Sequence, residues 1–261
     1  MKNHFPGVTL LVTHYNRSGS LERLLRTFTD LDCSFDAIVV SDDGSKPEHL
    51  DKLKSLAKLL DFQLVTTPKN KGLGNNINKG QDAVRTAYTL YVQEDFVPQP
   101  DFATHFNDAL TIMNQEPELD FIRFYAYFPY PYTEPYGKGF SRMVFKPSPW
   151  FSNHLKFYVY SDHPHLRRSN FLQKFGRYVE GKDVNVTEFQ MCLSVIQKKG
   201  QGLLFDEFTK VFDQKNSSTE PSTFYRASWR ESTHPVLLFA RWWYLKYRLL
   251  KNTFELALLK D

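Results

Sequence analysis

Short apolar runs alternate with segments of helical character from residue 8 to residue 92, and this alternation constrains the fold more than any other feature of the sequence. The first run, VTLLVT at 8–13, is apolar and β-branched, as in a strand buried on both faces of a parallel sheet. Further runs follow at 37–41, 62–66 and 88–92, and helices are predicted between them. Strands that alternate with helices of about 10–15 residues are typical of βαβ units. The sequence therefore predicts an α/β fold with a doubly wound, mostly parallel central sheet and helices on both faces.

Polar clusters follow all four predicted strands. Ligands of a doubly wound sheet bind outside the carboxyl ends of its strands, so these clusters define the candidate site. They occupy four short segments: Thr13–Arg17, Ser41–Ser45, Pro68–Gly74 and Gln93–Pro98. Each cluster alone could be an ordinary polar turn, and it is their coincidence at four strand ends that favours a ligand site.

The first two clusters suit a nucleoside. Tyr15 can stack on a base and Thr13 can hydrogen-bond to its edge, unless the tyrosine is simply packed in a turn. Asp42 and Asp43, ahead of Gly44, either form an Asx turn or accept hydrogen bonds from a base N–H or a ribose hydroxyl.

The other two clusters suit a diphosphate. Glycines in segment 70–80 let the backbone approach a ligand, and the helix that starts here offers free N–H groups to an anion. The spacing is neither a Walker loop nor a G-x-G-x-x-G fingerprint. Glu94 and Asp95 come directly after the fourth strand, where a carboxylate pair suits a divalent cation that bridges diphosphate oxygens. A solvated acidic turn is the alternative.

Together the four motifs resemble those of the inverting family-2 glycosyltransferases of the GT-A fold. The shared pattern spans residues 8–101: a strand followed by Thr-x-Tyr-Asn-Arg, then Asp-Asp-Gly-Ser, two Asn-x-Gly steps and an acidic pair before proline. The resemblance implies a nucleotide-sugar donor and a divalent metal, Mn2+ or Mg2+. Where the family has Asp-x-Asp, this chain has Gln93-Glu94-Asp95, which leaves one secure metal ligand.

The resemblance also implies which side chains hold the donor. Thr13, Tyr15 and Asp43 would contact the nucleobase, Glu94 would contact the ribose, and Asp95 would bind the metal. Residues of the same motifs complete the candidate donor-binding set: Arg17, Asn70, Gly72 and Asn78. Uracil is the expected base, since Tyr15 and Asp43 match positions that meet uracil in relatives.

The second half of the chain matches the family more loosely, around 187–193. Relatives start a helix here with an acidic pair whose second carboxylate is the general base, and Glu188 occupies that position, with Thr187 in place of the first acid. Glu188 would deprotonate the acceptor hydroxyl as it attacks the anomeric carbon. Two alternatives stay open: Asp183 is the base, or Glu188 is only a first-turn helix acid beside a Thr187 cap. Helices are predicted over 167–175 and 187–198.

A histidine late in the chain is a second candidate metal ligand. His234 lies in the polar, proline-containing segment 213–235, which is predicted to be a mobile loop. The family resemblance implies contact of such a histidine with metal or diphosphate, whereas an ordinary hydrogen-bonded histidine is the alternative.

Positive charge is concentrated at the C-terminus. Residues 226–261 carry seven of the 33 Lys and Arg residues and three of the 29 acids, which accounts for the whole net charge of +4. The neutral remainder disfavours nucleic-acid binding. A basic amphipathic helix is predicted over 236–261, with one narrow apolar stripe: Leu238, Trp242, Leu245, Leu249 and Leu256. Such a helix either lies on anionic lipid or packs against the domain or a second subunit.

Two further features concern organisation and location. Residues 1–125 are predicted to form the nucleotide-sugar-binding half of one domain, and 126–212 its acceptor-binding and catalytic half. Cys33 and Cys192 have no metal or redox spacing, which favours a reducing compartment. We find no signal peptide at 1–7 and no apolar stretch of about 18 residues. A cytoplasmic protein is therefore expected, at the inner face of the plasma membrane if the terminal helix binds lipid.

The expected activity is inverting transfer of a sugar from a nucleotide-diphosphate sugar to a glycan or lipid-linked acceptor in surface-polysaccharide synthesis, the last part by resemblance alone. A non-catalytic nucleotide-sugar-binding protein of the same fold is the alternative, because the acidic motif is thinned and Thr187 replaces an acid. A sugar nucleotidyltransferase is disfavoured, since its glycine-rich loop should follow the first strand and 14–20 is not such a loop.

Overall fold

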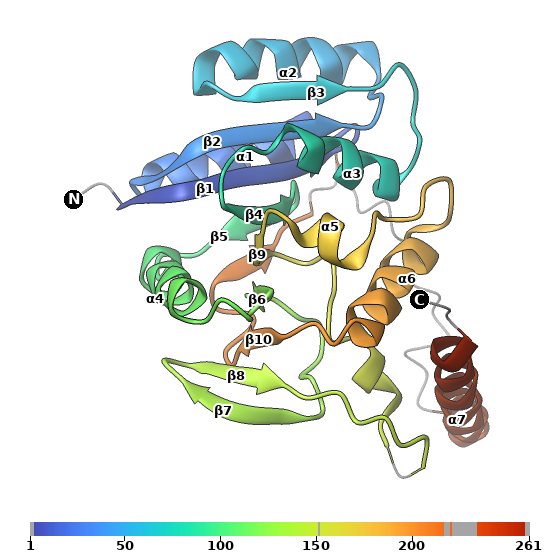
Figure 1. Ribbon diagram of the computed structural model, residues 1–261. Helices are drawn as coiled ribbons and strands as arrows, with labels where there is room; N and C mark the ends of the chain where they lie inside the picture. The colour runs from blue at the N-terminus through green and yellow to red at the C-terminus, as the bar shows by residue number, and fades with distance from the viewer. Residues whose placement is uncertain (1–2, 151, 217–219, 221–233, 259–261) are drawn as a thin grey trace.

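A nine-stranded sheet forms the centre of the protein, in the order β3-β2-β1-β4-β9-β6-β10-β8-β7 (Figure 1). It is described from a computed structural model, which covers residues 3–150, 152–216, 220 and 234–258. The predicted mobile loop at 213–235 lies mostly outside this range.

The N-terminal half of the sheet is parallel, as the sequence predicts. Strand β1 pairs with β2 on one side and β4 on the other, and β3 extends the sheet beyond β2. The bounds of these strands are β1 Asn3–His14, β2 Cys33–Asp42, β3 Gln63–Thr66 and β4 Tyr88–Gln93. The helices between them are α1 Ser18–Asp30, α2 Pro47–Leu60 and α3 Leu73–Ala83. The predicted α/β alternation is therefore confirmed.

The second half adds strands of both directions. Strand β9 (His165–Arg168) runs antiparallel between β4 and β6, while β10 is parallel to β6. The other elements of this half are α4 Phe102–Gln115, β6 Phe121–Arg123, β7 Thr133–Gly137, β8 Phe140–Met143, the 3-10 helix η1 His154–Phe157, α5 Phe171–Phe175, α6 Val184–Gln197 and β10 Gly202–Phe205. A separate ribbon pairs β5 (Phe96–Pro98) with β11 (Phe212–Gln214).

The helix predicted over 167–175 is wrong in its first part, because residues 165–168 form β9 and only the short α5 follows. The side chains of the two arginines point to opposite faces of the sheet, as the period of two in a strand requires. Arg167 is fully buried on one face and donates to the Tyr160 hydroxyl at 3.0 Å. Arg168 points to the other face and donates to a backbone carbonyl near the end of α4 at 2.7 Å.

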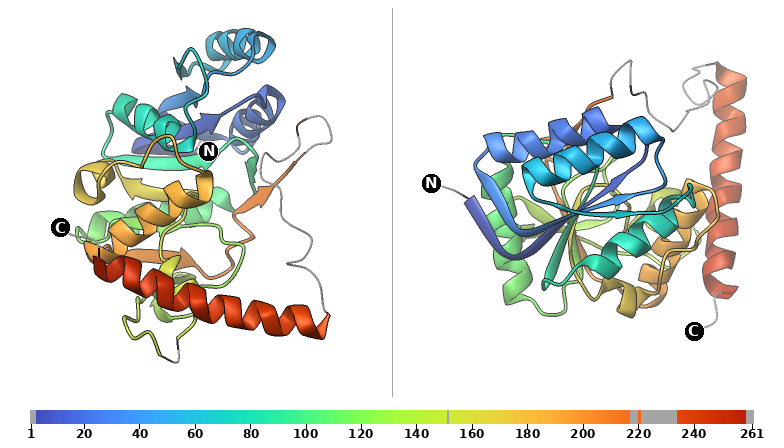
Figure 2. Two further views of the ribbon diagram at one scale, coloured as in Figure 1. Left: turned by 90° about the vertical axis from the view of Figure 1, so that its right-hand side faces the viewer. Right: turned by 90° about the horizontal axis from the view of Figure 1, so that it is seen from above.

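Helices cover both faces of the sheet, each set over its own apolar core (Figure 2). Helices α1, α2 and α4 pack on one face, and α3, α5 and α6 pack on the other. Strand β1 contributes to both cores: Leu10 and Val12 point into the first and Leu11 into the second. The expectation of helices on both faces is confirmed.

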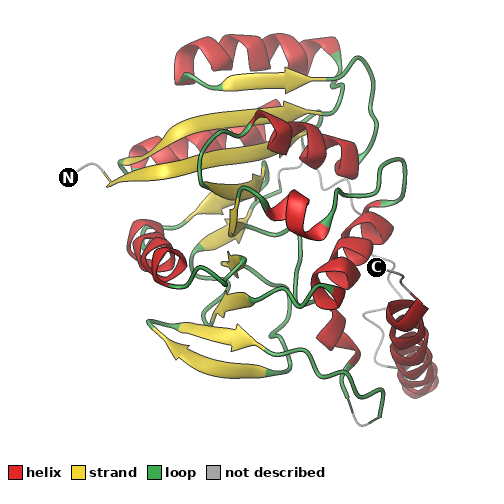
Figure 3. Ribbon diagram, in the orientation of Figure 1, coloured by secondary structure: helices red, strands yellow, loops and turns green. Residues whose placement is uncertain are grey.

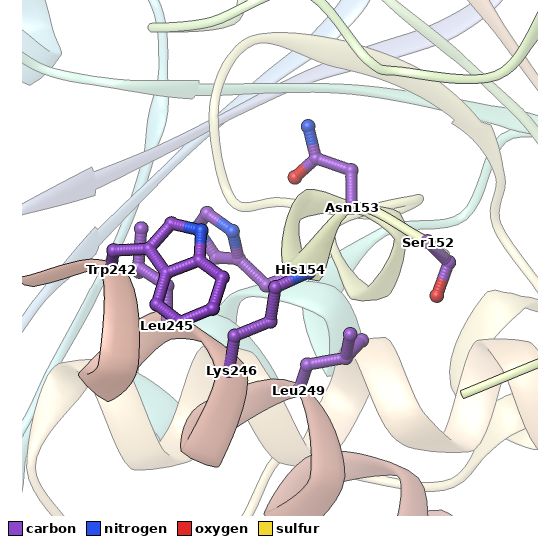
Figure 4. A pocket seen from close by; sticks show the side chains of 7 residues that line it. All are labelled: Ser152, Asn153, His154, Trp242, Leu245, Lys246 and Leu249. Carbon is purple, nitrogen blue, oxygen red and sulfur yellow. The ribbon is translucent and has the colours of Figure 1, made fainter. Parts of the chain in front are cut away.

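The C-terminal helix α7 (Pro235–Leu258) lies outside these layers, beside η1 and α6 (Figure 2). Leu249 is buried against Phe157 of η1 and Leu193 of α6. The predicted apolar stripe thus packs on the domain at Leu249 and Leu256, whereas Leu238 and Trp242 remain 45% and 51% exposed. A cavity of about 260 Å³ separates this part of α7 from residues 152–154 (Figure 4). Among the described helices, including α7, none is both long and apolar enough to cross a bilayer.

Candidate functional site

The sheet brings the predicted polar clusters to one edge. At the carboxyl end of β1, Thr13 lies beside Ser41 of β2 and Gln93 of β4. The acidic motif, Glu94 and Asp95, directly follows Gln93, the last residue of β4. Three of the four clusters therefore meet where the parallel strands end, as expected for a ligand site of this fold.

Asp43 attaches the fourth cluster, the glycine-rich loop, to the same edge. Its two carboxylate oxygens accept the backbone N–H groups of Lys71 (2.8 Å) and Gly72 (2.9 Å). Gly44 permits this close approach, because its φ is +68° and a Cβ there would lie 2.4 Å from the carbonyl carbon of Lys69. Burial raises the pKa of Asp43, and the two backbone hydrogen bonds oppose that shift. Asp43 therefore holds the loop that borders the strand ends.

The carboxylate of Asp42, by contrast, forms hydrogen bonds with its neighbours within the fold. Its Oδ1 lies 2.8 Å from His14 Nδ1, and its Oδ2 accepts the backbone N–H of Ser45 at 3.1 Å. Burial lowers the pKa of His14, although the neighbouring carboxylate opposes this. Of the two adjacent aspartates, only Asp43 contacts the glycine-rich loop.

The two nucleobase candidates at the end of β1 differ in whether their polar groups already have hydrogen-bond partners inside the protein. Thr13 is buried, and its hydroxyl lies 3.0 Å from that of Tyr91. Tyr15 is half-buried, in the turn between β1 and α1. The next residue, Asn16, has a φ of +53°, and its side chain accepts the backbone N–H of Lys46 at 2.8 Å. Tyr15 therefore offers ring surface, whereas the Thr13 hydroxyl has an internal partner.

A buried cluster of opposite charges occupies the acidic motif. Arg17 Nη1 lies 3.2 Å from Asp95 Oδ2 and 3.6 Å from Glu94 Oε1. All three residues are buried. Burial, followed by the charge of Asp95, raises the pKa of Glu94 to about 8. The guanidinium group therefore compensates a carboxylate pair that would otherwise be poorly solvated.

Two residues of this cluster were not singled out by the sequence analysis. Gln214 donates to Asp95 Oδ2 at 2.9 Å, and Asn216 accepts from Arg17 at 2.6 Å. They reach the site because β11 pairs with β5, which places Gln214 opposite Phe96. The available signal was the polar character of the segment that begins at 213, which gives no indication of its partner.

The acidic motif fits a divalent cation only as part of a site. In the ranges that the structure covers, no three His, Cys, Asp or Glu side chains converge to hold a metal. Mg2+ commonly takes one or two carboxylates, substrate phosphates and several waters. Asp95 can supply such a carboxylate once Arg17 has turned away, and a bound diphosphate would supply further oxygens. The residues present therefore fit a metal that arrives with the donor.

The remaining candidates of the donor set have different surroundings. Asn78 is buried and exchanges hydrogen bonds with the backbone of Tyr178, at 2.9 and 3.0 Å, so it links α3 to the loop before α6. Asn70 is exposed, and its side chain accepts the Gly72 N–H at 3.1 Å. His234 is exposed directly before α7, where its Nδ1 accepts the backbone N–H of Val236 at 3.3 Å. Metal contact by His234 stays a prediction.

Two carboxyl groups meet in the second half of the domain. Glu188 on α6 accepts the backbone N–H of Asp162 at 3.1 Å. Asp162 is buried, and its Oδ1 accepts the hydroxyl hydrogen of Tyr178 at 2.8 Å. Burial raises the pKa of both carboxyl groups, and the charge of Glu188 raises that of Asp162 further. The sequence analysis named Glu188, but not Asp162, as a base candidate.

Helix α6 begins earlier than predicted, which excludes the alternative that places Glu188 in its first turn. Asp183, rather than Thr187, is the N-cap, and its carboxylate accepts the Asn185 N–H at 2.9 Å. Thr187 lies inside the helix and donates to the Val179 carbonyl at 3.0 Å. Glu188 is therefore not a first-turn acid beside a Thr187 cap, and Asp183 is an exposed residue engaged in capping.

Tyr91 connects the strand-end cluster to the carboxyl pair. Its hydroxyl meets that of Thr13, and burial followed by the charge of Asp162 raises its pKa. Strand β4 pairs Tyr91 with His165 of β9, three residues beyond Asp162. The two groups of candidate residues are thus carried by neighbouring strands.

This fold and this arrangement of side chains at the strand ends define a glycosyltransferase of the GT-A class. Residues 9–176, more than half of the chain, match the family model of Glycosyl transferase family 2, and the chain belongs to that family. A relative from Bacillus subtilis (strain 168), named glycosyltransferase EpsH, is 29% identical over 97 residues, which are 37% of this chain and 28% of EpsH.

Solved structures show the same fold at low sequence identity. The structure of S. aureus TarS 1-349 in complex with UDP-GlcNAc covers 84% of this chain, with a TM-score of 0.59 and 15% identity, over 62% of its own chain. The mannosyltransferase PcManGT from Pyrobaculum calidifontis, in complex with GDP-Man and Mn2+, has a TM-score of 0.50 and 13% identity, over 75% of this chain and 53% of its own. The chain thus spans less than two thirds of the length of each of these relatives.

Proposed function

We propose that this chain transfers a sugar, with inversion, from a UDP-sugar to a hydroxyl group of a glycan or lipid-linked acceptor in surface-polysaccharide synthesis. The observation that carries the proposal is the succession of Thr13, Tyr91, Asp162 and Glu188, which joins the strand-end cluster to a half-buried base candidate. UDP as the donor nucleotide is supported by the structural likeness to TarS, which was solved with UDP-GlcNAc and with UDP.

The nucleotide would bind at the carboxyl ends of β1, β2 and β4. Tyr15 offers ring surface to the base, and Asp43 holds the glycine-rich loop beside it. Arg17 would turn from Asp95 to the diphosphate when the donor arrives. Asp95, with His234 as a second candidate ligand, would hold Mn2+ or Mg2+, which supplies positive charge to the departing diphosphate when bound.

Glu188 would act as the general base. The acceptor oxygen forms a bond to the anomeric carbon while the bond from that carbon to the diphosphate oxygen breaks, and the bonding electrons leave with UDP. The proton of the acceptor hydroxyl passes to Glu188. A single displacement of this kind inverts the anomeric configuration, and a positioned base contributes about 100-fold or more to its rate.

Thermal unfolding in the presence of nucleotides tests the donor assignment. The purified protein is heated with UDP, GDP, dTDP or CMP, each with and without Mn2+. UDP with Mn2+ should raise the melting temperature by a few degrees, because a ligand at about 100 times its Kd adds about 2.7 kcal/mol. Asp95→Asn should remove the part that depends on Mn2+. Stabilisation by none of the nucleotides would contradict the proposal, and stabilisation without turnover of any UDP-sugar would favour a non-catalytic binding protein.

Helix α7 is proposed to rest on an anionic membrane surface at the cytoplasmic side. The side of the helix away from η1 and α6 is apolar along its length, and each of its large residues is at least 47% exposed: Val236, Phe239, Trp243, Tyr247, Leu250 and Phe254. Helical spacing places Lys246 and Lys251 along the two edges of this outer face. An apolar face with aromatic rings and flanking lysines suits the headgroup region of anionic lipid.

Cosedimentation with lipid vesicles tests this contact. The protein should bind vesicles that contain phosphatidylglycerol and bind pure phosphatidylcholine much less. Trp243→Ser should weaken binding, whereas Trp242→Ser should not, because Trp242 lies at the groove facing His154 (Figure 4). Equal binding by both variants would contradict the assignment of the outer face. A dimer in solution that Trp243→Ser dissociates would assign this face to a second copy of the chain instead.

A further inference from the structure

A buried acid with no direct part in the proposed reaction lies against the proposed base. Asp162 sits in the loop before β9, and its backbone N–H donates to Glu188 Oε1 at 3.1 Å. Its Oδ1 accepts from the Tyr178 hydroxyl at 2.8 Å. Its other carboxyl oxygen, Oδ2, is buried and has no hydrogen-bond partner in the described part of the chain.

The surroundings of this pair favour a single negative charge. A buried carboxylate oxygen without a donor is poorly solvated, and two charges side by side repel each other. The nearby arginines donate elsewhere: Arg167 to the Tyr160 hydroxyl at 3.0 Å, and Arg123 to the Tyr158 carbonyl at 2.8 Å. In the described part of the chain neither guanidinium group donates a hydrogen bond to Asp162, although the charge of Arg167 favours its ionised form.

The two carboxyl groups differ in how far they are exposed to water: Asp162 is 3% exposed, whereas Glu188 is half-buried. Burial and the charge of Glu188 raise the pKa of Asp162 to about 8, although the Tyr178 hydrogen bond and the charge of Arg167 oppose this rise. Burial also raises the pKa of Glu188, but the hydrogen bond from Asp162 and the charge of Arg123 favour its ionised form. At neutral pH the proton therefore resides on Asp162 and the charge on Glu188.

We propose that Asp162 is a positioning residue for the base: its backbone N–H fixes one oxygen of Glu188, and its protonated carboxyl group confines the charge of the pair to Glu188. This inference rests on the proposed function, in which Glu188 takes the proton of the acceptor. Ionisation of Asp162 would place a second negative charge beside the base and weaken the site for an anionic donor.

The fully buried titratable and charged groups around the pair keep one charge state near neutral pH. They come from strands β4, β6 and β9, from helix α6 and from the loops between them: Tyr91, Arg123, Tyr160, His165, Arg167, Tyr178 and Cys192. Burial raises the pKa of the tyrosines and of the cysteine, and it lowers that of His165, so these groups stay neutral. One further titratable group lies beside the pair: His163 follows Asp162 in the chain, and its Nδ1 lies 2.9 Å from the Ser161 hydroxyl.

Infrared titration of the full chain tests the position of the proton without any need for turnover. The wild type should show the carbonyl band of a buried protonated carboxyl group at neutral pH and lose it through about pH 8. Asp162→Asn should lack that component. Tyr178→Phe should lose it at higher pH, because the hydrogen bond that favours the ionised form of Asp162 is gone. Glu94→Gln identifies the separate signal of Glu94. A spectrum that Asp162→Asn leaves unchanged overturns the proposal.

Kinetics on the same variants separate positioning from proton transfer. Asp162→Asn keeps the backbone N–H and the neutral side chain, so its rate of UDP release at neutral pH should stay within about tenfold of the wild type, whereas Glu188→Gln should lose about 100-fold or more. The decline of the wild-type rate above about pH 8 should be smaller in Asp162→Asn.

Two kinetic outcomes would overturn the assignment. A loss in Asp162→Asn as large as that in Glu188→Gln would make Asp162 the base, and a pH profile identical to the wild type would leave it a purely structural residue. Absence of turnover by the wild type with every UDP-sugar would refute the proposed function, and the infrared result would still decide the state of the pair.

Discussion

Arg17 is the residue that forms ion pairs with both carboxyl groups of the acidic motif. Its guanidinium group lies against Asp95 and Glu94, where the resemblance to the family places metal and ribose. A buried ion pair contributes little net stability, but removal of one partner leaves a buried charge uncompensated. Arg17 therefore occupies the place of a cation beside Asp95, and under the proposed function a metal would compete with it for that carboxylate.

Substitution of Arg17 tests this competition. Arg17→Gln should lower the free energy of unfolding by about 3 kcal/mol or more, because two buried carboxyl groups lose their cation. Mn2+ should then restore more stability to the variant than it adds to the wild type. Denaturant unfolding with and without Mn2+ measures both effects.

The control lies on the same helix. Arg26 pairs with Glu22 at 2.9 Å on the exposed surface of α1, so Arg26→Gln should cost less than about 1 kcal/mol and show no response to Mn2+. Similar losses in the two variants, or no added response of Arg17→Gln to Mn2+, would contradict the role given to Arg17.

Whether a site residue could be predicted from the sequence depends on how local its contacts are. Asp43, Glu94 and Asp95 follow buried strands directly, so the strand pattern alone places them at the edge of the sheet. Asp162 and Gln214 reach their partners across 26 and 119 residues of chain, and no local pattern encodes such pairings. Their positions depend on the pairing of β9 and β11, and the sequence does not indicate where these two strands lie in the sheets.

The same limit applies to whole elements. The first four strands could be predicted because burial on both faces of a parallel sheet demands continuous apolar runs. Strand β9 reads HLRR and has no such run, and the two terminal nitrogens of its buried Arg167 donate to Tyr160 and Gln81. Helix α7 has two apolar sides, and only the contacts with η1 and α6 show which of them is docked.

Neighbouring leucines of α7 test which side is docked. Leu249→Ala should lower the free energy of unfolding by about 2–3 kcal/mol, because Leu249 is 3% exposed and packs on Phe157. Leu250→Ala should change it by less than about 0.5 kcal/mol, because Leu250 is 47% exposed. Equal effects of the two substitutions would mean that α7 does not pack as described.

At the scale of the whole molecule, parallel and antiparallel strands are combined in one central sheet. Parallel strands collect the donor-side residues at their carboxyl ends, and the antiparallel insertion of β9 beside β4 brings Asp162 and Glu188 alongside them. The fold class and the family follow from the first half of the chain. The proposed base, Glu188, lies in the second half, so the proposed transfer requires both halves to be in place.

UDP release from a panel of UDP-sugars, measured beside UDP binding, tests the central claim that Glu188 drives transfer from a donor held at the strand ends. Wild type and Glu188→Gln should bind UDP with Mn2+ equally, while Glu188→Gln should release UDP about 100-fold more slowly or slower still. Equal rates of release would contradict this claim, because the displacement would then proceed without Glu188 as the base.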